Sequence, residues 1–242
     1  MATHSSAGRL RRDSETTRGI VKWAVLGFFS KLFLAAVLFI SAGRWDWGMG
    51  WVYVGIFAAF DVATALVLIP RSPGLLIERS RIQPGTKVWD KVLLRLAAGY
   101  FPMAAGVVAG LDVRNGWSAQ VALPLQIAAI VVTALGYAVV LWAMAANAFF
   151  SATVRIQKER GHTVATGGPY RFVRHPGYVG ALLYTLAVPI MLGSWWALIP
   201  SALSALAYVV RTALEDRTLH GELDGYREYA QRVRYRLLPG VW

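Results

Sequence analysis

Long apolar runs dominate this chain of 242 residues and restrict what it can fold into. Residues 20–42, 49–69, 92–111 and 121–149 are each long enough, at about 1.5 Å per residue, to cross roughly 30 Å of hydrocarbon as a helix. Apolar residues make up 56% of the chain and charged residues 16%, whereas soluble domains average about 25% charged. The sequence therefore predicts an all-α, polytopic membrane helical bundle.

A further apolar region, residues 178–210, is too long for one straight span and about right for two short ones. Residues 192–196 contain Gly193 and Ser194 and form the natural turn, so we expect a helical hairpin. The chain then has about six spans, four plus this C-terminal hairpin. We expect a polar, frayed N-terminal tail (1–19), a four-span scaffold (20–149), and a C-terminal region (150–242) formed by an interfacial loop, the hairpin and an amphipathic tail.

The net charge of +12 would suggest nucleic acid as a partner of a soluble protein, but here the charge lies between the spans. The N-terminus, residues 70–91, residues 150–177 and the C-terminal segment hold four, five, five and six Lys or Arg, and the two other loops hold one each. Positive residues concentrate in cytoplasmic loops of membrane proteins. We therefore interpret the charge as topogenic and expect no nucleic acid partner, with both termini and the loop at 150–177 on the cytoplasmic side.

Two charged residues, Lys31 and Asp61, fall inside the first two spans. Antiparallel spans joined by a short turn place them at similar depth, and an unpaired charge is costly in a membrane. We predict a structural contact between them; a polar substrate pathway is the alternative. Pro102 interrupts the third span, where we expect a kink.

Several chemistries are excluded by what the sequence lacks. It contains no cysteine, so there is no disulfide, thiolate metal site or thiol nucleophile. It has no G-x-G-x-x-G, Walker A or G-x-S-x-G motif, which argues against a Rossmann domain. Its histidines, at 4, 162, 175 and 220, do not have metal-ligand spacing, and we expect no metal.

Residues 161–180 form the longest polar, Gly- and Pro-rich passage between two apolar regions. Gly167-Gly168-Pro169 favours a tight turn with exposed backbone N–H groups, and Tyr170 offers a ring for an adenine or a sulfonium. Arg174 could hold a carboxylate or phosphate. Pro176 disfavours helix at His175 and directs that imidazole toward the start of the next span. The alternative is a basic interfacial loop at a helix start.

The segment after the hairpin carries complementary charge. Arg211 and Glu215 are spaced i,i+4 on one helical face, and Asp216 follows directly. We expect residues 211–242 to close over the polar passage, because both lie on the same side of the membrane.

These motifs, in this order, resemble the isoprenylcysteine carboxyl methyltransferase family over residues 147–242. The resemblance rests on His162-Thr163-Val164, on Gly168-Pro169-Tyr170, on Arg174-His175-Pro176-Gly177-Tyr178 with Gly180, and on Arg211, Glu215-Asp216, Tyr226, Tyr229 and Leu238-Pro239. At position 216 the family often has a second glutamate. Phospholipid N-methyltransferases and membrane sterol reductases share part of this pattern.

The resemblance implies an S-adenosylmethionine-dependent enzyme whose cofactor lies between the loop, the hairpin and the tail. The implied cofactor contacts are Gln157, His162, Thr163, Val164, Ala165, Tyr170, His175, Pro176, Gly177, Tyr178 and Glu215. Arg211 matches the position implied to hold the acceptor carboxylate. We take Arg211 and His175 as candidate catalytic residues, and Arg211 and Arg174 as candidate substrate-binding residues.

The expected reaction is methyl transfer to a carboxylate on a lipid-bearing, isoprenylcysteine-like acceptor that enters from the membrane lipids. A carboxylate is ionised near neutral pH, so no general base is required. Three alternatives remain open: a phospholipid amine N-methyltransferase, which would need His175 or Glu215 as a base; a sterol-type reductase using a nicotinamide cofactor; and a non-catalytic membrane scaffold or transporter subunit.

Overall fold

The computed structural model describes residues 3–79 and 83–242, and within these residues the regular structure is entirely helical. The long elements are α1 (Thr3–Ala42), α2 (Gly48–Arg71), α4 (Val88–Arg95), η1 (Leu96–Tyr100), α5 (Phe101–Asn115), α6 (Leu123–Ala146), α7 (Pro176–Met191) and α8 (Leu198–Glu222), with α4, η1 and α5 continuous. Four short helices, α3 (Pro73–Arg79), η2 (Lys158–Arg160), η3 (Gly168–Arg171) and α9 (Tyr226–Arg232), lie in the connections.

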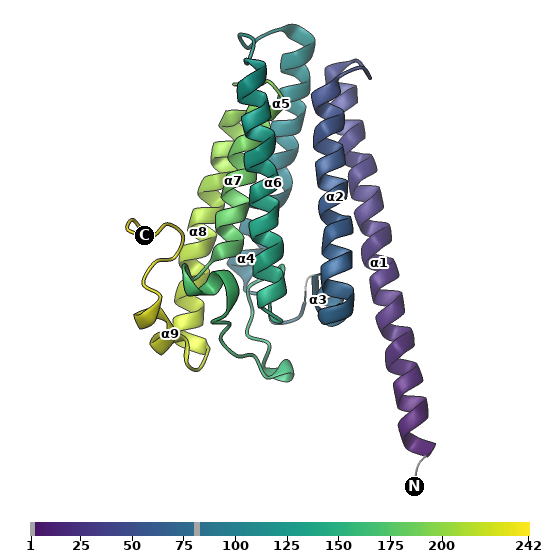
Figure 1. Cartoon of the computed structure of the whole chain (residues 1–242), viewed down its shortest axis with the longest axis vertical. Helices are drawn as coiled ribbons and strands as arrows, with labels where there is room; N and C mark the ends of the chain where they lie inside the picture. Colours follow the sequence, from purple (N-terminus) through teal and green to yellow (C-terminus); the bar gives the residue numbers. More distant parts are fainter. Residues whose placement is uncertain (1–2, 80–82) are drawn as a thin grey trace.

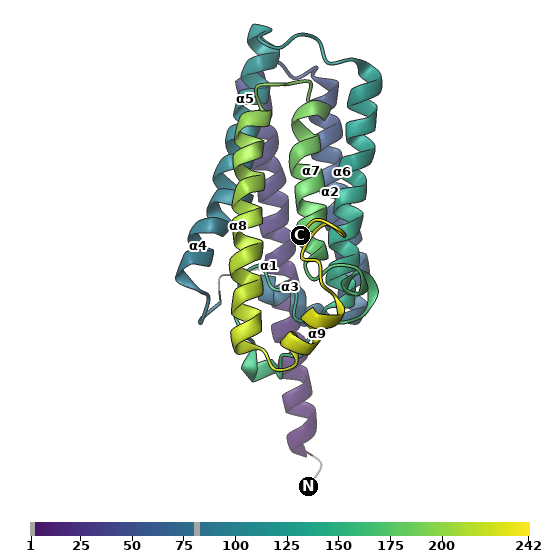
Figure 2. The same cartoon turned by 90° about the vertical axis from the view of Figure 1, so that its left-hand side faces the viewer.

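Five of the described helices are long and apolar enough to cross a membrane: Thr16–Ala42, Gly48–Arg71, Val88–Asn115, Leu123–Ala146 and Leu198–Glu222. The sixth predicted span is α7, whose 16 residues fall short of that length. It nevertheless lies beside α6 and α8 and runs antiparallel to both (Figures 1 and 2). The predicted helical hairpin is therefore present. The chain is a polytopic helical membrane bundle, as predicted.

Two boundaries differ from those expected. The backbone is helical from Thr3, so the predicted frayed tail is wrong for the described residues: with no proline before Pro70, the helix of the first span propagates backwards. The last helix continues past residue 210 to Glu222. Its polar residues do not end it, because Arg211, Thr212 and Asp216 are buried and bonded inside the protein.

The third span contains a π-helical turn, η1, directly before Pro102. A proline in a helix lacks the N–H that would bond to the preceding turn, and a π-turn is one way for the backbone to accommodate this. The interruption predicted at Pro102 is therefore present as η1. Ser204 of α8 donates to the carbonyl of Ala97 in this turn at 2.6 Å, so the irregular backbone is bonded inside the bundle.

The first hairpin is joined as predicted, because Lys31 of α1 donates directly to Asp61 of α2. Its ammonium nitrogen also lies 4.2 Å from the centre of the Phe57 ring. The two charges therefore compensate one another within the membrane-spanning part of the bundle.

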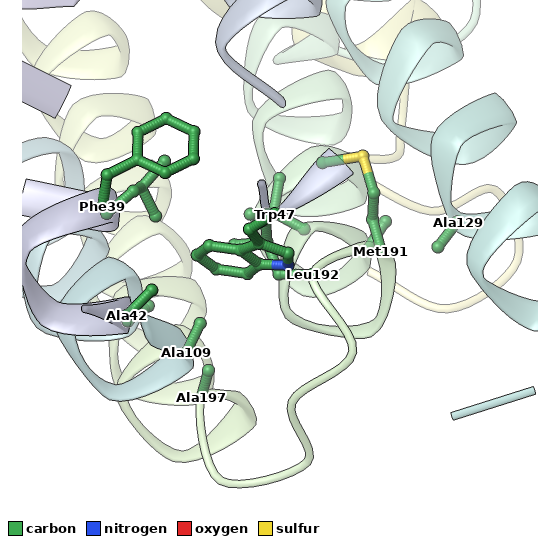
Figure 3. Close-up of a cluster of buried hydrophobic side chains, with 12 residues drawn as sticks. Phe39, Ala42, Trp47, Ala109, Ala129, Met191, Leu192 and Ala197 are labelled. Atoms are coloured by element: carbon green, nitrogen blue, oxygen red, sulfur yellow. The ribbon is translucent and has the colours of Figure 1, made fainter. Parts of the chain in front are cut away.

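Two packing features hold the C-terminal hairpin in place. At the end of the bundle opposite the N-terminus, Phe39, Trp47, Met191 and Leu192 belong to one buried apolar cluster (Figure 3). Gly136 of α6 faces Gly180 of α7 so closely that a Cβ at 180 would lie 2.4 Å from the carbonyl oxygen of Gly136. Small residues permit such close helix contacts in membranes, and here they set the position of α7, whose first residues enter the site.

Candidate functional site

A cavity of about 260 Å³ lies at the end of the bundle that carries α3, α9 and the connection between α6 and α7. Its polar lining comes from that connection, from the facing ends of α7 and α8, and from α3 and α9. Its apolar lining comes from Leu94, Ala98, Val140, Ala181, Tyr184 and Tyr208, on helices within the bundle. The cavity therefore joins a polar mouth to an apolar interior.

The C-terminal tail closes onto the polar loop through its backbone. The N–H groups of Arg174 and His175 donate to the carbonyls of Tyr235 and Arg236 at 2.9 and 3.0 Å. The Tyr229 hydroxyl donates to the carbonyl of Tyr170 at 2.7 Å. The expected closure of residues 211–242 over the loop is thus observed, and α9 lies beside the lower ends of α7 and α8 in Figure 2.

Asp216 is the buried carboxylate around which the loop and the tail meet. It is 1% exposed and accepts from Arg174 Nε at 2.8 Å, Arg236 Nε at 2.8 Å and the Tyr226 hydroxyl at 2.8 Å. His175 Nε2 lies 3.1 Å from the same carboxylate. An aspartate at this position, where the family often has glutamate, is therefore fully engaged in holding the site together.

The guanidinium of Arg174 mainly bonds to residues that join the loop to the tail. Besides Asp216, it donates from Nη1 to the carbonyls of Val233 and Arg234 at 3.0 and 2.7 Å. The nearby carboxylate raises the pKa of Arg174 against the opposing effect of burial. Its side chain borders the cavity, but four of its contacts already go to the protein. Its predicted role in substrate binding stays a prediction, and the geometry favours a positioning role.

Arg211 has a partner that the sequence did not suggest. Its Nε donates to Asp90 Oδ1 at 2.6 Å, and Nη2 donates to the carbonyl of Ala152 at 2.6 Å. Asp90, in the first turn of α4, is fully buried and also accepts the backbone N–H of Val154 at 2.7 Å. Arg211 and Glu215 share one helix, as their spacing indicated, but Arg211 bonds to α4 and not to Glu215. Its Nη1 has no hydrogen bond to any described residue.

Glu215 also borders the cavity, but its partners are weaker. It accepts a short hydrogen bond from the Tyr178 hydroxyl, and His175 Nδ1 lies 4.0 Å away. No arginine or lysine among the described residues forms an ion pair with it. A partly buried carboxylate in this setting favours a cationic ligand.

His162 and Tyr170 supply uncharged surfaces to the mouth of the cavity. Burial, with Arg160 and Arg155 nearby, lowers the pKa of His162 to about 4, so its imidazole is neutral near pH 7. Its Nδ1 accepts the Gln157 N–H at 3.3 Å, and its ring lies 4.6 Å from that of Phe149. Burial likewise raises the pKa of Tyr170. Both groups are therefore uncharged near pH 7.

Most of the predicted site residues meet at this cavity. Those that border it are His162, Thr163, Val164, Ala165, Tyr170, Arg174, His175, Gly177, Tyr178, Arg211 and Glu215. Gln157 and Pro176 do not. Gln157 is fully buried and fastens the loop by donating to the carbonyl of Phe149 at 2.8 Å and accepting from Arg160. Pro176 is the first residue of α7, where a missing N–H costs nothing.

Three lining or supporting residues were not predicted: Asp90, Arg79 and Glu78. They lie before or at the start of the third span, and their loop was interpreted only as topogenic. Glu78 is buried and pairs with Arg155 at 2.9 Å. A carboxylate directly before an apolar span is the only sequence signal that pointed to Asp90. Within residues 3–79 and 83–242, no group of three or more potential metal ligands occurs.

The fold and the site define a class: a helical membrane protein with a ligand cavity at one end of its bundle. Residues 125–222 match the family model described as phospholipid methyltransferase. A protein-S-isoprenylcysteine O-methyltransferase B from Arabidopsis thaliana is 32% identical over 91 residues, covering 35% of this chain and 44% of the relative. A probable protein-S-isoprenylcysteine O-methyltransferase from Oryza sativa subsp. indica is 30% identical over 86 residues, covering 35% of this chain and 45% of the relative.

These similarities confirm the resemblance to the isoprenylcysteine carboxyl methyltransferase family in the C-terminal half, where α6, α7 and α8 lie. The matched region spans less than half the length of the curated relatives. The first helices of this chain, together with Arg79 and Asp90, lie outside the matched family model.

Proposed function

We propose that this chain is an integral membrane methyltransferase that transfers a methyl group from S-adenosylmethionine to the carboxylate of a lipid-bearing, isoprenylcysteine-like acceptor. The observation that carries the proposal is the single cavity that joins His162–Ala165, Tyr170, His175 and Glu215 to an apolar interior. Such a cavity accommodates a polar cofactor and a lipid in contact with one another. The names of the relatives support the same reaction.

The residues at the polar mouth fit this cofactor. S-adenosylmethionine, if bound here, would supply a sulfonium methyl group; its S–CH₃ bond would break, with the electron pair going to sulfur, as a carboxylate oxygen formed the new O–CH₃ bond. Glu215 offers a negative charge that forms no ion pair with any described Lys or Arg, and neutral His162 adds no repulsion. Tyr170 offers a buried aromatic surface.

The protein's own part is alignment and exclusion of water. Asp216 fixes His175 at the start of α7, and this places the imidazole within 4.0 Å of Glu215. Asp90 orients Arg211 and leaves its Nη1 group for the acceptor. No residue has to remove a proton, because the acceptor carboxylate is already ionised. Holding both reactants in one dry cavity lowers the barrier through proximity and desolvation.

The orientation of the site follows from charge. The loops at the end with the cavity carry most of the Lys and Arg residues, so we propose that this end and both termini are cytoplasmic. The soluble cofactor would then enter from the cytoplasm, while the lipid enters from the bilayer.

A second candidate function is the N-methylation of a phospholipid amine, because the matched family model is described as phospholipid methyltransferase. That reaction releases a proton and requires a base, for which Glu215, at the border of the cavity, is one candidate. His175 is the other candidate, because Asp216 and Tyr226 contact its Nε2 while its Nδ1 lies 4.0 Å from Glu215.

The test begins with purified chain in detergent. Calorimetry should detect binding of S-adenosylmethionine and of its demethylated product, and Glu215→Gln should weaken both. Label from the methyl group should then appear on an S-prenylated N-acetylcysteine as a base-labile ester, and Arg211→Ala should reduce turnover while leaving cofactor affinity near that of the wild type. Label that appears only on phosphatidylethanolamine, in a base-stable form, would replace the carboxylate proposal with the amine one. Absence of cofactor binding would refute both.

A further inference from the structure

Among the described residues, four arginines border the cavity, and three of them form ion pairs with carboxylates of the protein. Arg155 pairs with Glu78 at 2.9 Å. Arg174 pairs with Asp216 at 2.8 Å, and Arg211 with Asp90 at 2.6 Å. The fourth cation, Arg79, must therefore be considered separately.

Arg79 is the last residue of α3 and has no carboxylate within ion-pair distance among the described residues. Its Nη1 lies 3.5 Å from the carbonyl oxygen of Phe150, at the limit of a hydrogen bond, and its guanidinium carbon lies 5.2 Å from the Phe150 ring centre. Burial lowers its pKa, and Arg211 adds to this effect. An arginine stays protonated even so, and a partly buried cation without a counterion favours an anionic ligand.

Among the described lining residues, one group of each sign has no ion pair with a Lys, Arg, Asp or Glu. Glu215 is the carboxylate, which interacts with Arg211 only beyond ion-pair distance, and Arg79 is the cation. Asp90 already compensates the charge of Arg211 and accepts hydrogen bonds from its Nε and Nη2 groups. A cationic cofactor beside Glu215 would compensate the negative charge there, and an anionic acceptor beside Arg79 would compensate the positive one.

We propose that Arg79 binds the anionic group of the methyl acceptor and supplies the positive charge that Arg211, paired with Asp90, lacks. This inference rests on the proposed function, since the anion is the carboxylate to be methylated. Arg79 reaches the cavity from α3, which packs on α1 and α2, outside the region that matches the family model. Selection of the acceptor is therefore assigned to the N-terminal scaffold, and retention of the cofactor to the C-terminal region.

The experiment measures binding of an S-farnesylated N-acetylcysteine and of its neutral methyl ester, in the presence of the demethylated cofactor. The variants are Arg79→Gln, Arg79→Lys and, as the matched control, Arg71→Gln. Arg71 is the last residue of α2, just before α3, but is exposed and lies outside the cavity. Calorimetric cofactor affinity and thermal stability are measured for every variant.

We expect the wild type to prefer the acid, and Arg79→Gln to lose affinity for the acid by roughly tenfold to a hundredfold, as for a charged hydrogen-bonded contact. Affinity for the ester and for the cofactor should stay near the wild-type values. Arg79→Lys should recover part of the loss, and Arg71→Gln should match the wild type. In turnover, the Arg79 change should raise KM for the acid far more than it lowers kcat.

Two results would overturn the inference: no preference for the acid in the wild type, or an unchanged preference in Arg79→Gln. An equal loss of cofactor affinity in Arg79→Gln would also overturn it, because Arg79 would then serve the fold or the cofactor. A different result would refute the proposed function and not the role of Arg79. A wild type that prefers the acid through Arg79 but transfers no methyl group to it would refute the reaction and leave the assignment of Arg79 intact.

Discussion

Replacing Asp216 with asparagine tests whether one buried carboxylate holds the loop and the tail together. The side chain is 1% exposed and contacts Arg174, His175, Tyr226 and Arg236. Asparagine keeps the shape, removes the charge and turns one acceptor oxygen into an N–H₂ group facing guanidinium donors. Arg174, which is itself buried, would then lack a counterion.

The expected loss can be estimated from these contacts. Breaking a buried ion pair by removing one partner costs about 3–5 kcal/mol. Asparagine still accepts one hydrogen bond and Arg236 is partly exposed, so we expect the lower end, about 3 kcal/mol. For a chain of this size such a loss corresponds to a decrease in Tm of roughly 6–12 °C.

The assay combines thermal unfolding in detergent with limited trypsin digestion. Asp216→Asn should lower Tm and expose the tail to cleavage after Arg232 and Arg234, because Arg174 would no longer fix their backbone. Asp224→Asn is the matched control, since Asp224 is exposed in the turn between α8 and α9. A Tm within about 2 °C of the wild type, with the tail still protected, would refute the role assigned to Asp216.

Three further predictions concern charge, packing and pH. Lys31→Leu should destabilise the bundle, because the charge of Asp61 is left without a partner, and combining it with Asp61→Leu should recover most of the lost stability. If chemical unfolding shows the double variant to be as unstable as the single one, the pair is not purely structural. Gly180→Ala should cost about 1–3 kcal/mol, since its Cβ would lie 2.4 Å from the Gly136 carbonyl oxygen, while alanine at Gly221, where no neighbour is close, should be tolerated. The pKa of His162 is lowered to about 4 in the folded state, so the unfolded chain binds the proton first as the pH falls below about 6.5. The contribution of His162 to the free energy of unfolding should therefore decrease between pH 6.5 and 4 and stay constant above about pH 6.5. His162→Gln should flatten this part of the stability profile, and an unchanged slope would place the titrating group elsewhere.

The sequence predicted those parts of the fold that depend on local pattern. A run of apolar residues is long enough to span a membrane whatever its neighbours are, so the spans and the turn near Gly193 could be located. The contact between Lys31 and Asp61 was also predictable, because a short turn fixes the relative depth of adjacent antiparallel helices. The end of α8 was not, because Arg211 and Asp216 are stabilised by partners far away in the chain.

The candidate site was predicted in part for the same reason. The resemblance named the residues of the loop and of α8, and most of them border the cavity. It could not name their partners, since Asp90 lies 121 residues from Arg211 and no pattern links the two. Gln157 remains a prediction as a cofactor contact: its position in the motif implied that role, and in the structure its amide bonds to Phe149 and Arg160 and shapes the loop.

The arginines illustrate why counting charge was sufficient for topology and insufficient for function. Arg79, Arg155, Arg174 and Arg211 contribute equally to the positive excess at one end of the bundle. In the folded chain three of them are tied to buried carboxylates, which removes their net charge from the cavity but keeps their shape and donors. Only the geometry separates a cation that holds the protein together from one that is left for a ligand, and that distinction assigns different tasks to the two halves of the chain.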